Sequence, residues 1–196
     1  MGDKHIYSMI LASALIGPVF AQQPSGSEIK AREENQQDRI GNGIASGQLT
    51  AGEAAKLETK ESNINKQIAK DRLANGGNLT NKEKAQVNSQ QNNLSKQIYN
   101  DKHNAATQKY GNNEVDKRRE NQQDRIANGV QSGQLTAGET AKLESQESQI
   151  NKEVQTDRKA NGGNLTNKQK VQVNKQLNRE SARIYNKKHN AAQGPK

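Results

Sequence analysis

The feature that most strongly constrains the fold of this chain is a Leu-Thr-x-x-Glu or Leu-Thr-x-x-Gln pattern, which occurs four times, each time shortly after a glycine. In such a pattern the Thr hydroxyl accepts from an amide three residues on, and the Glu or Gln oxygen accepts from the Thr amide, which marks the first turn of a helix. Glycine ends helices because it takes the left-handed conformation readily. The sequence therefore predicts four places where one helix ends and another begins. The predicted capping residues are Thr50, Glu53, Thr80, Glu83, Thr136, Glu139, Thr166 and Gln169.

The chain also contains a tandem duplication with a period of 86 residues, the spacing from Thr50 to Thr136. Residues 28–107 recur as 114–193, with a linker at 108–113 and a tail at 194–196. The glycine stops and capping patterns predict helices over 28–45, 51–74 and 81–106, and again over 114–131, 137–160 and 167–192. Short turns make consecutive helices antiparallel neighbours. We therefore expect an all-α fold in which a three-helix antiparallel hairpin, built from helix-turn-helix repeats, occurs twice.

Sparse apolar residues at three-four spacing form a narrow stripe on each predicted helix, typical of a coiled-coil-like seam. Glu61 and Glu147 interrupt this stripe. They either pair with a basic residue of a neighbouring helix or lie at the edge of the seam; the edge is expected, because burying a lone carboxylate is costly. Only 29% of the residues are hydrophobic, so we expect the copies to pack on each other or on other chains. The seam positions are Ile40, Ile44, Leu57, Ile64, Ile68, Val87, Leu94, Ile98, Ile126, Val130, Leu143, Ile150, Val154, Val173, Leu177 and Ile184.

The first residues are typical of a secretory signal. Lys4 and His5 precede an apolar run from Ile6 to Phe20, and cleavage is expected after Ala21. A membrane anchor would need about 20 apolar residues, more than this run supplies. Residues 1–21 are thus predicted to be a signal peptide and residues 22–27 a flexible leader. The protein is expected to be exported, to the periplasm or outside the cell, and it has no Cys for disulfides.

Three segments carry a resemblance over nearly the whole mature chain. They are RENQQDRI at residues 119–126, SGQLTAGE at residues 46–53 and ANGGNLT at residues 74–80. These segments resemble a family of exported bacterial proteins that carry such a helical module once or several times. The resemblance implies bacterial export and a repeat architecture, and it implies no catalytic activity.

A second, local resemblance is to the EF-hand calcium loop. The loop beginning at Asp71 has a polar residue at its fifth position and Gly at its sixth, but a calcium loop also needs oxygen ligands at positions 3 and 12. Leu73 and Lys82 stand at those positions here. The alternative is that Asn-Gly and Gly-Gly only terminate a helix. If calcium binds, the resemblance implies Asp71, Asn75, Asp157 and Asn161 as its ligands.

The formal net charge of +9 suggests a polyanion partner, nucleic acid or an acidic cell-surface polysaccharide, although basic and acidic residues are interleaved. No motif in the sequence predicts a catalytic site, a cofactor or a small-molecule substrate. We therefore expect a non-enzymatic helical repeat protein with a structural or interaction role, associating with itself in a scaffold or filament. A calcium-responsive module and a polyanion binder are the alternatives.

Overall fold

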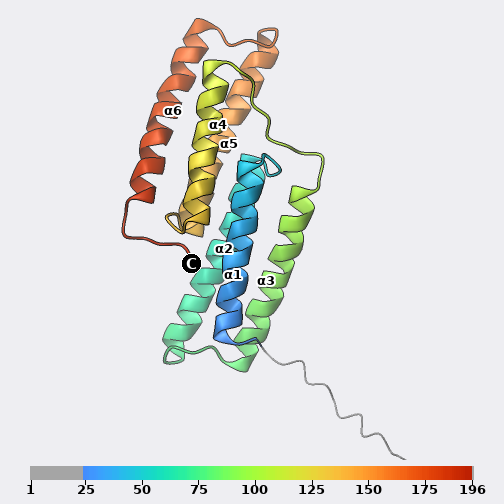
Figure 1. Cartoon of the computed structure of the whole chain (residues 1–196), viewed down its shortest axis with the longest axis vertical. Helices are drawn as coiled ribbons and strands as arrows, with labels where there is room; N and C mark the ends of the chain where they lie inside the picture. The colour runs from blue at the N-terminus through green and yellow to red at the C-terminus, as the bar shows by residue number, and fades with distance from the viewer. Residues whose placement is uncertain (1–23, 196) are drawn as a thin grey trace, which may run out of the picture.

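The computed structural model describes residues 24–195, and this part of the chain confirms the all-α prediction, with six helices and no strand (Figure 1). The predicted signal peptide lies outside the described residues. Among the described helices, none is both long and apolar enough to cross a membrane. The helices are α1 (Gly26–Ala45), α2 (Ala51–Ala74), α3 (Asn81–Lys102), α4 (Glu114–Gln131), α5 (Ala137–Ala160) and α6 (Asn167–Lys188).

Capping boxes begin four of these helices at the predicted threonines. The hydroxyl oxygens of Thr50, Thr80, Thr136 and Thr166 each accept from an amide three residues on, at 3.3 Å. A fifth box, between Ser25 and Glu28, starts α1, so that the last two residues of the predicted leader are helical. Local hydrogen bonding therefore fixes where these five helices begin.

The third helix of each copy is shorter than predicted. α3 ends at Lys102 and α6 at Lys188, whereas the sequence predicted helix to 106 and 192. The chain leaves the helix there because it folds back over the turn that precedes the copy's second helix. The amide of Gln108 donates to the Gly47 carbonyl at 2.9 Å, and the amide of Gly194 donates to the Gly133 carbonyl at 2.8 Å.

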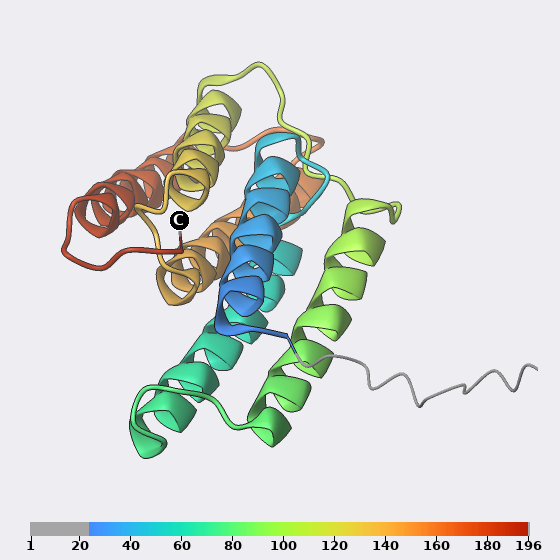
Figure 2. The ribbon, with the colours of Figure 1, turned by 60° about the horizontal axis from the view of Figure 1, so that its bottom comes forward.

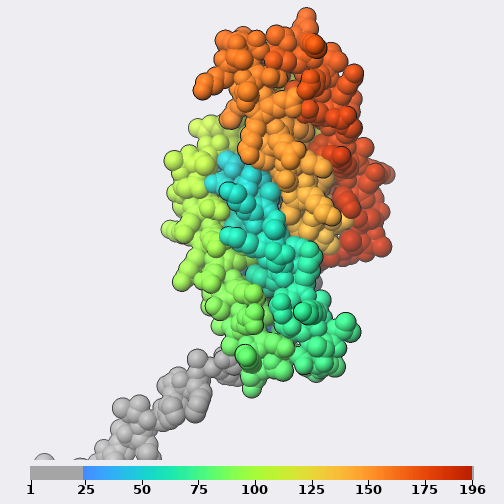
Figure 3. Space-filling model, turned by 180° about the vertical axis from the view of Figure 1, so that it is seen from behind, coloured from blue at the N-terminus to red at the C-terminus, as the bar shows by residue number. Residues whose placement is uncertain are grey.

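The two copies pack on each other through α2 against α5 and α1 against α4, the most extensive helix contacts of the described chain. A Cβ added at Gly52 would lie 3.1 Å from the Ser148 oxygen, and one at Gly138 would lie 3.0 Å from the Ser62 oxygen. The start of each helix therefore lies beside the middle of the other, so α2 and α5 run antiparallel about an approximate two-fold axis. Figure 3 shows α2 and α5 side by side, and Figures 1 and 2 show α3 and α6 at opposite outer edges.

All sixteen seam positions are buried, and none is more than 6% exposed. The third helices do not, however, use the same positions in both copies. Leu177 of α6 occupies the place that Gln91 has in α3, and Glu180 occupies the place of Leu94. All four side chains are buried, so the two halves differ in polarity at matching points of the core.

Candidate functional site

Two fully buried carboxylates lie on the helices that join the copies, Glu61 on α2 and Glu147 on α5. Neither oxygen of either side chain has a hydrogen-bond partner. The prediction that both lie at the edge of the seam is therefore wrong. The reason is that each acid lies among the helices of its own copy: Glu61 is near Glu33 of α1, and Glu147 is near Arg119 of α4 and Glu180 of α6.

Glu58 and Glu144 are a second matched pair of buried acids, one turn before the first. Gln37 donates to Glu58 at 3.0 Å, and Gln123 donates to Glu144 at 3.1 Å. These amides come from α1 and α4, so each copy ties its first helix to its second through one buried amide–carboxyl contact.

Burial raises the pKa of these acids. The pKa of Glu61 rises to about 9, chiefly through burial and further through the nearby carboxyls of Glu33 and Glu58. Burial raises the pKa of Glu58 and of Glu147 to about 8. A group with such a pKa keeps its proton at pH 7. These buried acids are therefore neutral at pH 7, which is how an interior with so little compensating charge accommodates them.

Buried glutamines also join the first helix of each copy to the third. The Gln36 amide nitrogen donates to the Gln91 carbonyl at 2.6 Å, and that of Gln91 donates to the Ile29 carbonyl at 3.0 Å. Gln122 of α4 donates in the same way to the Leu177 carbonyl at 2.7 Å. Sequence reasoning did not identify these residues. The signal was the Gln-Gln pair that recurs in the middle of the first helix of each copy.

The predicted calcium ligands lie at the ends of α2 and α5. Asp71 accepts from the Gln67 amide at 2.7 Å, and the Asn75 amide nitrogen donates to Glu83 at 2.9 Å. Asn161 donates in the same way to the Asp157 carbonyl at 2.7 Å. The two asparagines thus direct amide nitrogens, not oxygens, at their neighbours. Over the described range no three His, Asp or Glu side chains are grouped to hold a metal ion. This geometry gives the calcium alternative no support.

A groove of about 930 Å³ runs between α1, α2, the start of α5 and the tail after α6. A smaller groove of about 450 Å³ occupies the equivalent place in the other half. All the residues that line the smaller groove have counterparts, 86 positions away, in the lining of the larger one. The larger groove extends further, along Ile29, Glu33, Ile68 and Arg72.

The equivalent extension in the second half is filled by the chain itself. The ring of Tyr110 lies 5.0 Å from the guanidinium carbon of Arg119, a cation–π arrangement. The buried Arg119 donates to Asp116 and to Asn151, both at 2.8 Å, and Arg158 donates to Asp116 at 3.0 Å. The linker thus closes this part of the second half with an aromatic ring over the buried ion pair of Arg119 and Asp116.

One exposed aromatic pair recurs on the outer helix of each copy. Tyr99 stacks on His103 with ring centroids 4.2 Å apart, and Tyr185 stacks on His189 at 4.1 Å. In both pairs the histidine Nδ1 lies 2.7 Å from the carbonyl oxygen of its tyrosine. The residues Tyr99 and Tyr185 are 58% and 57% exposed. The chain therefore presents the same aromatic patch twice, at opposite edges.

Comparisons with protein-family models, with curated proteins and with solved structures give no match for this chain.

Proposed function

We propose that the chain is an exported, non-enzymatic interaction protein that associates with further copies of itself. The observation that carries this proposal is the repeated Tyr–His stack, exposed on α3 and again on α6. The apolar seams are buried within each copy, and α1, α2, α4 and α5 cover one another between the copies, so association has to use the outer faces. Exposed aromatic rings are suited to this because they bury much apolar area and lose little rotamer freedom.

Two equivalent patches at opposite edges determine the form that association takes. If one patch pairs with the same patch of another chain, each chain offers two joints, and the assembly grows without a fixed size. The expected contact is small, so growth should appear only as the concentration is raised. Export and the repeat architecture rest on the sequence and its family resemblance, and the polyanion alternative stays a prediction.

Light scattering on residues 22–196 over a concentration series tests this proposal. The unchanged chain should gain mass continuously as the concentration rises. The variant Tyr99→Ser, which keeps one patch, should stop at a dimer, and the variant Tyr99→Ser/Tyr185→Ser should remain a monomer. Both tyrosines are exposed, so helix content should be unchanged in each variant. An unchanged chain that is monomeric at every concentration would refute self-association.

A further inference from the structure

The outer helix of the second copy, α6, is much more basic than its counterpart α3. It carries seven basic residues and one acid, whereas α3 carries four basic residues and two acids. The acid of α6, Glu180, is buried, so the charges that this helix exposes are all positive. Because both helices have the same place in their copies, this is a difference in surface chemistry and not in architecture.

Four of the basic residues of α6 are spaced four residues apart and form a row along the helix. We call this row the basic ridge, and its members are Lys175, Arg179, Arg183 and Lys187. Residues four apart lie on successive turns, so the ridge extends over about 18 Å. The row of α3 that matches it contains no basic residue, and its members are Ser89, Asn93, Gln97 and Asp101.

Two members of the basic ridge are paired within the chain and two are not. Arg183 donates to Glu180 at 3.1 Å, and Lys187 forms an ion pair of 3.4 Å with an acid of α5. Lys175 and Arg179 are exposed, and neither forms an ion pair within residues 24–195. These two cations can therefore bind an anionic partner without breaking an existing pair.

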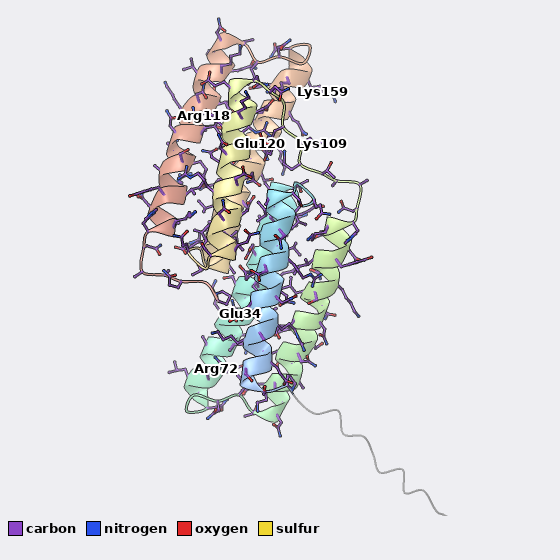
Figure 4. All side chains as sticks on the ribbon, in the orientation of Figure 1. Glu34, Arg72, Lys109, Arg118, Glu120 and Lys159 are labelled. Carbon is purple, nitrogen blue, oxygen red and sulfur yellow. The ribbon has the colours of Figure 1, made fainter. Side chains whose placement is uncertain are left out.

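The neighbouring helices restrict the width of such a partner. On the α5 side lie two acids, Glu153, which accepts from Gln176 at 2.7 Å, and Glu139, the partner of Lys187. On the other side Arg118 of α4 reaches α6 and adds positive charge (Figure 4). Positive charge is thus confined to a strip along α6. Duplex nucleic acid is wide enough to bring phosphates against the acids of α5, whereas a thin linear chain can follow the strip.

The chemistry of α6 also favours an acidic polysaccharide over single-stranded nucleic acid. Single strands bind to proteins through aromatic side chains on which successive bases stack. α6 has one aromatic residue, Tyr185, and its ring is already stacked on His189. An acidic polysaccharide needs no such platform, because its charges lie along a thin chain of sugar rings.

We propose that the basic ridge of α6 binds a linear acidic polysaccharide, with carboxylate groups on Lys175 and Arg179. Guanidinium and ammonium groups bind carboxylates through charge-assisted hydrogen bonds. Each chain has one such site, because α3 lacks the ridge. The ridge does not include the Tyr–His patches, so this binding does not depend on self-association.

The test is fluorescence anisotropy of a labelled oligogalacturonate, which carries one carboxylate on each sugar, titrated with residues 22–196. The matched control ligand is its methyl ester, which keeps the sugar chain and lacks the charge. The acid should bind saturably, and more weakly as the salt concentration rises, and the ester should not bind.

Two variants of equal charge locate the site. Lys175→Ser/Arg179→Asn copies the residues of α3 and should weaken binding about tenfold, since each exposed charge contact contributes up to about fivefold. Lys82→Ser/Lys96→Asn removes the same charge from exposed positions of α3 and should weaken binding by less than about twofold, because distant charges are screened. All four residues are exposed, so circular dichroism should show unchanged helix content in both variants.

The proposal is overturned if the oligogalacturonate does not bind, or if its methyl ester binds as tightly. Equal losses in the two variants would show that the overall charge of the chain, and not the basic ridge, holds the ligand. Tighter binding of a duplex DNA of the same length would identify nucleic acid as the partner and would contradict the assignment to a polysaccharide.

Discussion

Replacing Glu61 by Gln should stabilise the protein at neutral pH, although it changes a fully buried side chain. The pKa of Glu61 is raised from 4.5 to about 9, by burial first and by Glu33 and Glu58 second. Between these two values the folded chain holds a proton that the unfolded chain releases, so stability is greatest below pH 4.5 and falls as the pH rises towards 9. Each pH unit costs about 1.4 kcal/mol, so this group lowers the free energy of unfolding by about 3 kcal/mol at pH 7.

Glutamine keeps the shape of the protonated acid and does not titrate, so the variant should lose this dependence. At pH 4 the two proteins should unfold alike. At pH 7 the variant should melt about 10 °C higher, since about 3 kcal/mol corresponds to 2–4 °C per kcal/mol in a chain of this size. Thermal unfolding followed by far-ultraviolet circular dichroism at pH 4, 5.5, 7 and 8.5 measures both effects.

The exposed Glu120→Gln is the matched control and should leave the melting temperature within about 1 °C at each pH. Glu147→Gln should behave as Glu61→Gln does, since burial raises the pKa of Glu147 to about 8. At lower pH the capping acids act in the opposite sense: the amide of Thr80 lowers the pKa of Glu83, so its contribution is lost as the pH falls. A Glu61→Gln variant with the melting temperature and pH slope of the unchanged chain would show that Glu61 is ionised and solvated, contrary to this reasoning.

Three further substitutions test the packing and the caps. Gly43→Ala should cost about 1–3 kcal/mol, because its Cβ would lie 2.7 Å from Leu49 side-chain carbons; Gly76→Ala, where φ is +64° and no atom lies within 4 Å, should cost only the backbone strain of about 1 kcal/mol. Thr50→Ala should cost about 1 kcal/mol, because the hydroxyl that accepts from the Glu53 amide is lost. Urea unfolding measures all three, and a Gly43→Ala variant as stable as the unchanged chain would contradict the packing assigned to Gly43.

The helix starts could be predicted because they depend on local chemistry. A threonine and the acid three residues on satisfy each other's amides wherever they stand, so the sequence alone locates the first turn. The Ser25–Glu28 box was missed because no leucine precedes it and no glycine turn separates it from an earlier helix. The ends of α3 and α6 could not be located, because they are set by the remote carbonyls of Gly47 and Gly133.

The candidate sites depend on contacts between helices that are far apart in the sequence, and the sequence predicts such contacts less well than it predicts helix starts. Burial of Glu61 follows from the packing of α2 within its own copy, where Glu33 of α1 lies nearby, and the spacing of apolar residues did not predict that an acid would be enclosed there. The small residues Gly52 and Ser62 mark the contact of α2 with α5, but small residues alone do not say which helix approaches. The second groove is shorter because Tyr110 lies over Arg119, where the first copy has Glu33. The sequence shows this difference between the copies, but it does not predict the contact of the linker tyrosine with the arginine.

The most direct test of the central claim, that the two copies pair antiparallel within one chain, is cysteine cross-linking. The chain has no native Cys. A Cβ built at Gly52 lies 4.0 Å from that of Ser148, and one at Gly138 lies 3.9 Å from that of Ser62, both within the span of a disulfide. The variants Gly52→Cys/Ser148→Cys and Ser62→Cys/Gly138→Cys should each oxidise to a disulfide within one chain, identified by mass spectrometry of proteolytic fragments.

Gly52→Cys/Ser62→Cys places both thiols on one helix and should stay reduced. If the first two variants also stay reduced, or form disulfides only between chains, the two copies do not pair as described.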